Sequence, residues 1–517
     1  MKFIGQLLGE HLARYPAMQV SDVYKLLHQA ALGPAHAITG SDALARLEAE
    51  AAARSGGADG PLAEVISPDG RLARVHLDVY RAKGLPLDAL ATKFNTELDA
   101  VRASLGHLPR CVRAGLPRGR RHAASWSRRL NAAMHDSSLR IRDVIAIPTS
   151  FPVRAEDSVT LGVGRAVKRD AVIVKIVTES GLVGYGEAHH GRAPGAVAKL
   201  VETTLRQLVV GQDAHDVTGI WKRVYDKQLA SHGLGAAASI GLSGIDMALW
   251  DVRGKATGLP LYRLLGGADR PVPAYAGGVS LGYQPPEDLV AEAGVHVAQG
   301  YKAVKLRIGD TVRDDLARIE AVRRAFGDDL VILTDANTGY DLKAARAAMP
   351  GLDALNAGWL EEPFPAHDYH SYRLAAQLGR TPLAAGENHY TRFEFQHVID
   401  TQAVTILQPD LSKSGGITEC LRIAHLASTW KLPVHPHTSM TGLNMAACVH
   451  FLCAIDNAGY FEADVSKNNR FRDQLVATPF RIGADGCVRP LNGPGLGVEV
   501  DEAFLAAHPL IDGPAYV

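Results

Sequence analysis

The sequence predicts an α/β protein built around a (β/α) barrel, and two observations carry this prediction. From residue 272 onward, short apolar or β-branched runs alternate with amphipathic helical patterns at fairly regular intervals, which is typical of parallel βα units. Eight such runs match the eight strands of a closed barrel. An open doubly wound sheet has the same alternation and ranks second, because no glycine-rich phosphate loop follows the first strand. The expected strands are 272–276, 303–308, 330–334, 358–360, 383–385, 404–407, 433–436 and 460–461.

The chain before the barrel divides into further parts. A length of 517 residues exceeds what one hydrophobic core supports, so several domains are expected. Residues 1–108 carry mostly helical patterns and predict a small helical domain, to which we assign no role. Residues 109–138 hold seven arginines and no acid before Asp136, so we interpret them as a basic linker, with anion or nucleic-acid binding as the alternative.

Residues 139–268 predict a β meander followed by helices. An alternating strand covers 141–147, and the runs 171–177 and 182–187 form a hairpin that turns near Gly181. Apolar residues at helical spacing over 237–254 predict a long helix. We expect the helices of this region to cover the meander.

Composition excludes several classes of protein. Hydrophobic residues make up 47% of the chain, charged residues 21%, and the formal net charge is zero, which is typical of a globular protein rather than a disordered or strongly nucleic-acid-binding one. The five cysteines are scattered without a CxxC pair, which argues against a zinc site or a disulfide scaffold. No signal peptide or membrane span is evident at the N-terminus. We therefore expect a cytoplasmic protein without a membrane partner.

Carboxylates stand at the ends of three successive predicted strands. The third strand ends in Asp335, the fourth in Glu361 and the fifth in Glu387. Barrel enzymes carry their reactive groups at the carboxyl ends of the strands, and neighbouring strands lie side by side. The three side chains can therefore converge on one hard cation, with positions left open for water or substrate. The sequence predicts a Mg²⁺ site here.

These segments resemble a known family. The runs DAN, WLEEP and GEN at consecutive strands, then QPDLSKSGGITE and VHPHT, are similar to the mandelate racemase subgroup of the enolase superfamily, within the mandelate racemase/muconate lactonizing enzyme family. The runs GLVGYGEA, GLSGIDMALWDVRGKATGLPLYRLLGG and NGPGLGVEVD extend the resemblance from residue 139 to the C-terminus. It implies a modified (β/α)₇β barrel over 269–475, and a capping domain over 139–268 that the segment 476–517 completes. It also implies that Asp335, Glu361 and Glu387 are the metal ligands.

The resemblance further implies roles for charged residues around the metal. Removing the proton α to a carboxylate requires that the enediolate be stabilised as it forms. Lys305 matches the first lysine of the family's KxK motif, which binds a carboxylate oxygen of the substrate. Glu462 matches the acid that hydrogen-bonds the other oxygen, and it would need a raised pKa to donate. Asn337, in the DAN run, is expected to bind substrate.

The proton acceptor is predicted from strands six and seven. His437 ends the seventh strand and Asp410 the sixth, so the carboxylate can orient the imidazole and stabilise its protonated form. We expect His437 to be the base. His435 is interpreted as a structural histidine that points the other way along the strand. Lys413 is the alternative base, because another subgroup uses a sixth-strand lysine, and we assign it a supporting role.

Arg307 departs from the family's pattern, since the second lysine of KxK would supply a base on the opposite face of the substrate. Arginine stays protonated, with a pKa above about 12, so a two-base racemisation is disfavoured and a one-base reaction favoured. We therefore expect an acid-sugar dehydratase that forms a 2-keto-3-deoxy acid, with Arg307 as an electrostatic group. A racemase, epimerase or lactone cycloisomerase that uses the same enediolate is the alternative.

The substrate is expected to be a small polar acid. By the family's pattern two capping-domain loops, about 149–169 and 188–195, set specificity, and the second contains His189 and His190, which can bind hydroxyls or a distal carboxylate. We expect His189 to bind a sugar acid or diacid, and we expect a homo-oligomer that binds no nucleic acid. A binding or regulatory protein that has lost turnover is the rival from another class, and the complete set of metal, acid and base positions argues against it.

Overall fold

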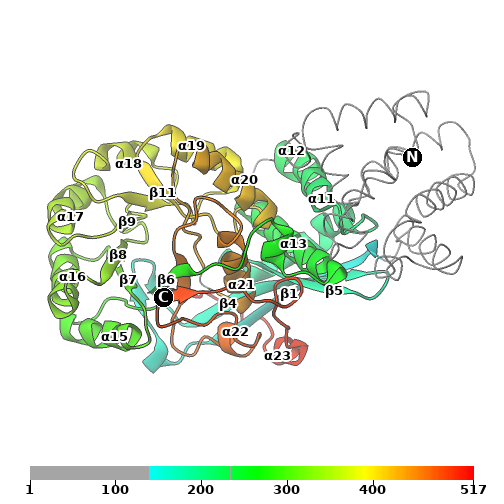
Figure 1. Cartoon of the computed structure of the whole chain (residues 1–517), viewed down its shortest axis with the longest axis horizontal. Coiled ribbons are helices and arrows are strands. Elements are labelled where there is room, and N and C mark those ends of the chain that lie inside the picture. The colour runs from blue at the N-terminus through cyan, green and yellow to red at the C-terminus, as the bar shows by residue number, and fades with distance from the viewer. Residues whose placement is uncertain (1–138, 233–234, 439) are drawn as a thin grey trace, which may run out of the picture. The chain divides into compact units, whose positions relative to one another are not determined.

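The computed structural model of this chain describes residues 139–517, apart from 233–234 and 439. These residues fall within a single unit, Ser137–Val517, in which an antiparallel sheet with its helices adjoins a barrel of parallel strands (Figure 1). The predicted helical domain 1–108 and basic linker 109–138 lie outside the described residues. Within the described ranges, no helix is both long enough and apolar enough to cross a membrane.

The barrel strands run parallel in the order β11-β10-β9-β8-β7-β6-β12. Val434 completes the ring, because it forms parallel bridges with Leu407 of β11 on one side and with Ala458, ahead of β12, on the other. The predicted (β/α) barrel is confirmed. The strands are β6 (Val272–Gly277), β7 (Ala303–Arg307), β8 (Val331–Asp335), β9 (Leu360–Glu361), β10 (Leu383–Ala385), β11 (Val404–Leu407) and β12 (Phe461–Asp464), with β13 (Cys487–Val488) antiparallel on β6.

One predicted strand is wrong. Residues 433–436 were expected to form a strand, but only Val434 pairs, through single bridges. Pro433 and Pro436 flank it, and proline has no N–H to donate to a sheet ladder, so pairing cannot extend past one residue.

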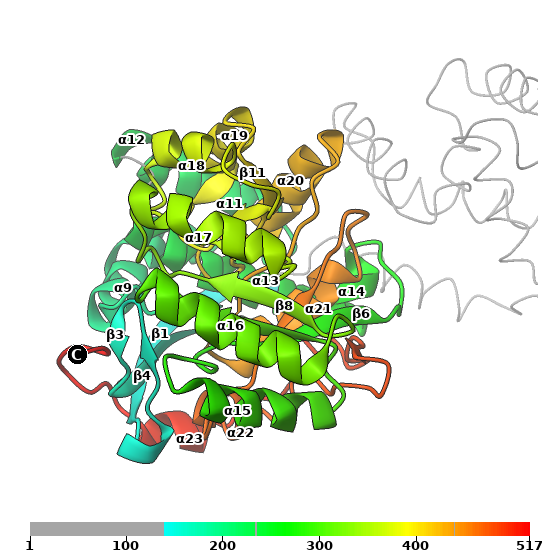
Figure 2. The same ribbon diagram turned by 90° about the vertical axis from the view of Figure 1, so that its left-hand side faces the viewer.

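Helices surround the barrel on its outer side (Figures 1 and 2). Each carries an apolar stripe toward the strands; α16, for example, buries Ile319 and Val322 while Arg313 and Arg324 are exposed. The barrel helices are α15 (Pro286–Ala298), α16 (Val312–Phe326), α17 (Leu342–Ala354), α18 (Tyr369–Ala375), α19 (Thr391–Asp400), α20 (Gly416–Thr429) and α21 (Gly442–Leu452), and the short helices α22 (Arg470–Asp473) and α23 (Glu502–Ala507) follow β12.

The antiparallel sheet has the order β1-β4-β5, with β1 (Ile141–Pro152), β4 (Lys168–Thr178) and β5 (Val183–Ala188). Gly181 lies in the β4–β5 turn at a φ of 84°, where glycine is favoured, as the hairpin prediction requires. Between β1 and β4, residues 153–167 form the 3₁₀ turn η2 (Ala155–Asp157) and the strands β2 (Thr160–Leu161) and β3 (Gly164–Arg165), so this loop is shorter than the expected 149–169.

The long helix α13 (Ala236–Thr257) lies across this sheet and contains the predicted helix 237–254. Gly184 and Gly186 on β5 permit the close approach, since a β-carbon on Gly186 would lie 2.2 Å from the carbonyl oxygen of Gly244. The remaining helices are α9 (Pro194–Leu200), η3 (Val201–Leu205), α10 (Arg206–Val209), α11 (Val217–Val224), η4 (Tyr225–Leu229), α12 (Ala230–His232) and α14 (Leu261–Leu264).

The C-terminal residues lie against the loop between β3 and β4. The N–H of Arg165 donates to the carbonyl of Val517 over 2.8 Å, and the N–H of Val167 donates to that of Ala515 over 2.9 Å. This pairing holds Tyr516 beside the start of β4.

Candidate active site

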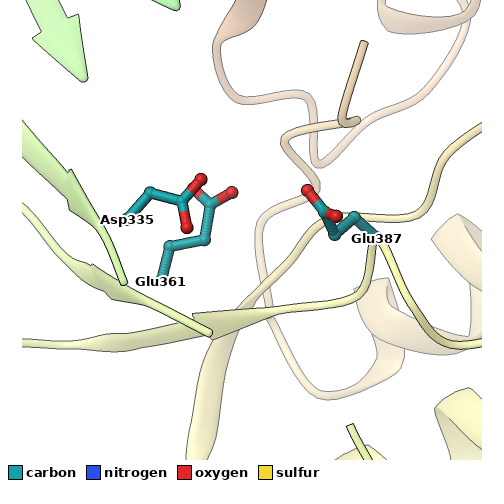
Figure 3. A group of neighbouring side chains, drawn as sticks. All are labelled: Asp335, Glu361 and Glu387. Atoms are coloured by element: carbon teal, nitrogen blue, oxygen red, sulfur yellow. The ribbon is translucent and has the colours of Figure 1, made fainter. Parts of the chain in front are cut away.

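Three carboxylates converge at the carboxyl ends of neighbouring barrel strands. Asp335 ends β8, Glu361 ends β9, and Glu387 follows β10. Figure 3 shows their carboxylates pointing toward one another, with Asp335 and Glu361 side by side and Glu387 across from them. One oxygen from each lies within 4.8 Å of the others. The sequence prediction that these residues converge is confirmed.

The donor set fits a hard divalent cation. Carboxylate oxygens are the ligands that Mg²⁺ prefers, at about 2.0–2.1 Å from the ion, so two opposed ligands lie roughly 4.2 Å apart. The observed spacing of up to 4.8 Å requires only a small inward movement of the side chains. Burial and the neighbouring carboxylate of Asp335 raise the pKa of Glu361 to about 8, which reflects crowded negative charge that a cation would relieve.

Lys305 on β7 lies among these carboxylates. Its Nζ lies 2.8 Å from Oε1 of Glu361, 2.9 Å from Oε1 of Glu462 and 3.4 Å from Oδ2 of Asp335. The side chain is fully buried. Burial lowers the pKa of Lys305. The carboxylates of Glu361 and Glu462 raise it by more than burial lowers it, so the ammonium stays charged.

Arg307, two residues along β7, binds the same cluster. Its guanidinium forms an ion pair with Asp335, donates to the carbonyl of Gly278, and reaches Oδ1 of Asn337 over 3.2 Å. The N–H of Asn337 donates to Oδ1 of Asp335 over 2.8 Å. Arg307 and Asn337 therefore both hold Asp335 in place. A substrate contact is expected for Asn337, and here it contacts Asp335 and Arg307.

His437 and Asp410 form the predicted dyad. The imidazole Nδ1 lies 2.7 Å from Oδ2 of Asp410, and Nε2 lies 3.0 Å from Oε2 of Glu387. The other oxygen of Asp410 accepts from the N–H and hydroxyl of Ser412, each over 2.7 Å, and from Nδ2 of Asn444 over 3.1 Å. Asp410 is thus held as an anion, and Nε2 faces the carboxylate cluster.

The charges of this cluster set the protonation of its cations. Burial lowers the pKa of His437, but Glu387 and Glu462 outweigh it and raise the value to about 9. Lys413 has its Nζ 3.5 Å from Oε1 of Glu387, and that carboxylate with Asp410 raises its pKa despite burial. Both groups are held as cations here, but the ordinary pKa of lysine is about 10.4 and that of histidine about 6.5, so His437 is the easier of the two to deprotonate. This agrees with a supporting role for Lys413.

Glu462 differs from the expectation. Burial alone would raise its pKa, but Lys305 and His437 lower it to about 2. Its Oε1 also accepts from the N–H of Gly278 over 3.1 Å, and its Oε2 from the N–H of Thr438 over 3.1 Å. In this arrangement the pKa of Glu462 is therefore lowered and not raised, because a carboxylate that accepts from several N–H donors is stabilised as the anion.

His435 points away from this cluster. Its Nδ1 accepts from the N–H of Tyr460 over 2.9 Å, and its ring packs against Trp359 with centroids 5.2 Å apart. The structural assignment is confirmed, but strand direction is not the cause, since residues two apart on a strand share a face. The chain leaves strand geometry after Val434, and this turns His435 and His437 apart.

The loop after β5 reaches the same end of the barrel. The N–H of His189 donates to the carbonyl of Ser412 over 3.0 Å, next to the dyad. His189 and His190 are nearly buried, with ring centroids 4.0 Å apart. The structure therefore brings His189 beside the His437–Asp410 dyad, and within the described residues no hydrogen bond or ion pair joins it to the carboxylate cluster.

Supporting residues around the site were not identified from the sequence. Trp359 Nε1 and Gln408 Nε2 donate to Oε2 of Glu361 over 3.1 and 2.7 Å, and Asn388 Nδ2 donates to Oε1 of Glu387 over 3.0 Å. Gln408 directly follows β11, and Asn388 follows Glu387 in the loop after β10, so a search for polar residues there, not only for acids, would have found them.

Family comparisons agree with this geometry. Residues 146–266 match the mandelate racemase/muconate lactonizing enzyme N-terminal domain, and residues 288–504 match the enolase C-terminal domain-like family. Arabinonate dehydratase of Saccharolobus solfataricus is 34% identical over 66% of this chain and 90% of its own length. A 3,6-anhydro-alpha-L-galactonate cycloisomerase of Streptomyces coelicolor is 32% identical over 70% of this chain and 96% of its own.

Solved structures give the same result. A member of the enolase superfamily from Polaromonas sp. JS666 is 55% identical, covers 73% of this chain and all of its own, and superposes with a TM-score of 0.71. A racemase from Streptomyces coelicolor with bound magnesium is 28% identical over 72% of this chain and 100% of its own, with a TM-score of 0.66. This chain therefore belongs to the mandelate racemase/muconate lactonizing enzyme family of the enolase superfamily and is an enzyme.

Proposed function

We propose that this chain is a Mg²⁺-dependent acid-sugar dehydratase. The observation that carries the proposal is the meeting of three carboxylates, the ammonium of Lys305 and a His437–Asp410 dyad at one end of the barrel. Relatives named arabinonate dehydratase and D-galactonate dehydratase, each 34% identical, support this class of reaction.

Asp335, Glu361 and Glu387 would hold the magnesium. When bound, the ion neutralises negative charge that develops on the substrate carboxylate as the α-proton leaves. Lys305 supplies a second positive charge at the same place, and its buried position strengthens that interaction.

His437 removes the α-proton. Asp410 occupies Nδ1, so Nε2 is the ring atom that faces the cluster and can accept the proton. The resulting imidazolium keeps its ionic hydrogen bond to Asp410, which stabilises it. In this structure Nε2 contacts Glu387 instead, and substrate would occupy that side of the ring.

The same imidazolium then completes the elimination. The C–H bond at C2 and the C–O bond at C3 break, a C2=C3 double bond forms, and the hydroxyl leaves as water with the proton from His437. The enol product ketonises to a 2-keto-3-deoxy acid. The reaction needs no second base, and this agrees with an arginine at position 307. Burial lowers the pKa of Arg307, but Asp335 and Glu462 raise it by more, so the guanidinium stays charged.

A cycloisomerase is the second candidate. It would form the same enediolate but close or open a ring instead of releasing water. The 3,6-anhydro-alpha-L-galactonate cycloisomerase at 32% identity and a D-galactarolactone cycloisomerase at 33% support it, since both match this chain nearly as well as the dehydratases.

Product analysis tests the proposal. The full-length protein with Mg²⁺ would be incubated with a library of mono- and diacid sugars and the products treated with semicarbazide. A dehydratase yields a 2-keto acid that forms a semicarbazone. Turnover of an acid sugar without such a product would replace the dehydratase by an epimerase. Turnover of a lactone or anhydro acid alone, with no loss of water, would replace it by the cycloisomerase.

A further inference from the structure

A small pocket beside the barrel mouth is separate from the carboxylate cluster. Its polar wall comes from the start of β4 and the loop after β5, and its apolar wall comes from the barrel and the C-terminal residues. The residues that matter here are Lys168, Arg169, Asp170, His190, Val279 and Tyr516. The side chains close in so far that no water-sized sphere fits, so an occupant must displace some of them.

The pocket adjoins the catalytic groups along two paths. Val279 follows Gly278, whose carbonyl accepts from Arg307. His190 follows His189, whose N–H donates to Ser412 beside the dyad. These chain neighbours link the pocket to residues of the candidate active site, so the group that would meet the pocket is the far end of a substrate whose reacting end lies at the carboxylate cluster.

Lys168 and Asp170 form a closed pair in the pocket wall. Nζ of Lys168 lies 3.1 Å from Oδ2 of Asp170 and donates to the carbonyl of Ile511 over 2.5 Å. Oδ1 of Asp170 accepts from Ser150 over 2.6 Å. These charges balance each other, so neither requires a ligand.

Arg169 has no hydrogen-bonded partner of this kind. Its side chain is only 6% exposed, and its Nη1 is buried without a hydrogen-bond partner among the described residues. Asp464, whose carboxylate lies 4.0 Å from Nη1, is beyond hydrogen-bond distance. The oxygens of Asp464 already accept from the N–H of Ser466 over 2.7 Å and from Nδ2 of Asn469 over 3.1 Å. A buried guanidinium N–H without an acceptor is costly, and an acceptor entering the pocket would remove that cost.

His190 adds a neutral donor. Its Nδ1 accepts from the N–H of Arg192 over 2.9 Å, which places the ring proton on Nε2. Burial, together with the positive charge of Lys413, lowers the pKa of His190 to about 3, so the ring stays neutral at working pH. One unsatisfied guanidinium and one neutral N–H donor suit a planar anionic acceptor, which arginine binds through two parallel hydrogen bonds.

We propose that Arg169 and His190 bind a second carboxylate at the far end of the substrate, so that the enzyme acts on sugar diacids in preference to monoacids. This inference rests on the proposed function, because it assumes that a sugar acid occupies the site. The narrow pocket favours a carboxylate over the bulkier phosphate group of a phosphorylated sugar acid.

Matched substrate pairs test the inference. The full-length protein with Mg²⁺ would be assayed on galactonate and galactarate, gluconate and glucarate, and arabinonate and arabinarate, whose members differ only in the terminal CH₂OH or carboxylate. For the pair of accepted configuration, we expect kcat/KM to be at least about tenfold higher for the diacid. Equal values, or preference for the monoacid or its terminal phosphate ester, would overturn the inference and leave the dehydratase proposal intact. No turnover in any pair would count against the dehydratase itself.

Variants locate the effect at Arg169. In Arg169→Gln, kcat/KM for the diacid should fall by about tenfold or more, while the monoacid value changes less than about twofold. Arg169→Lys, which keeps the charge but loses the two-pronged geometry, should lie between. Arg142→Gln, an exposed arginine on β1 of the same sheet, is the control and should match the wild type. An equal loss for both substrates would make Arg169 merely structural.

Binding without turnover gives an independent readout. Calorimetric titration of the Mg²⁺-loaded wild type with adipate and hexanoate compares a six-carbon diacid with its monoacid. Adipate should bind more tightly, and the difference should vanish in Arg169→Gln. If the variant fails to fold, the wild-type comparison alone decides, and equal affinity for the two acids would overturn the inference.

Discussion

Asp410 and His437, 27 residues apart in sequence, share a hydrogen bond of 2.7 Å between Oδ2 and Nδ1. Asp410 follows β11, and His437 follows the single bridge of Val434, which is the next position around the barrel. Ser412 and Asn444 hold the other carboxylate oxygen, and the ring of His437 turns its Nε2 toward Glu387.

Asp410→Asn tests whether this pair works as a unit. The amide keeps the size of the side chain but removes the charge that stabilises imidazolium, and it can hold the wrong tautomer. We expect turnover to fall roughly a thousandfold, with little change in melting temperature. Asp329→Asn, an exposed acid on the barrel, is the control. Unchanged turnover in Asp410→Asn would transfer the role of base to Lys413.

Glu361→Gln and Glu387→Gln test the metal site. Each removes one charged ligand, so calorimetry should show much weaker Mg²⁺ binding, and turnover should be abolished. The metal-free protein should lose little stability in Glu361→Gln, because burial and Asp335 already hold the pKa of Glu361 at about 8 and the uncharged form is nearly as favourable. Glu320→Gln on α16 is a matched exposed control. Wild-type Mg²⁺ affinity in either ligand variant would show that the cluster is not the metal site.

Arg307 is tested by isotope exchange. Because its guanidinium stays protonated, incubation of substrate in D₂O should exchange the α-proton on one face only. His437→Asn should eliminate that exchange. Exchange on both faces, or exchange that persists in His437→Asn, would identify a second competent base and favour an epimerase.

The sequence predicted those parts of the fold and site that depend on local pattern. β10 and β11 begin and end at the expected residues, and the acids that follow β8, β9 and β10 converge as parallel strands require. The strand expected at 433–436 does not form, because two of its four residues are prolines, which have no N–H to donate to a neighbouring strand. A prediction from the hydrophobic pattern alone does not take this into account.

What the sequence could not predict depends on contacts between distant segments. The low pKa of Glu462 arises from Lys305 on a different strand, more than 150 residues earlier in the chain. The pocket around Arg169 exists because β4 begins at Lys168, beyond the end of its pairing with β5, and because the C-terminal residues pack against it. Neither relationship leaves a local sequence signal.

Gly186→Ala tests the packing of α13 on β5. The added β-carbon would lie 2.2 Å from the carbonyl oxygen of Gly244 and 2.7 Å from the backbone nitrogen of Ala248, so backbone must move. We expect a loss of about 3 kcal/mol or more in denaturant unfolding. Gly181→Ala, at a turn with nothing within 4 Å but a φ of 84°, should cost only about 1 kcal/mol. Equal losses would show that the close approach is not what requires Gly186.

Asp246→Asn tests a pH dependence of stability that originates outside the catalytic site. Asp246 on α13 is buried, and its Oδ2 accepts from the N–H of Thr418 over 2.9 Å. Burial raises its pKa to about 7, although the hydrogen bonds from Thr418 lower it. Two residues of α20 have smaller effects: Arg422 lowers the pKa and Glu419 raises it.

The sign of the effect follows from proton binding. Because the folded pKa of Asp246 lies above the unfolded value of about 4, the folded state binds more protons between these values. The protonated Asp246 therefore adds up to about 4 kcal/mol to the free energy of unfolding. This stabilisation is complete below about pH 4 and is lost as the pH rises toward 7. Asp246→Asn removes this ionisation, so the variant should match the wild type near pH 4 and exceed its free energy of unfolding near pH 8. Denaturant unfolding at both pH values measures this difference, and a variant that is equally destabilised at both would show that Asp246 is charged in the folded protein.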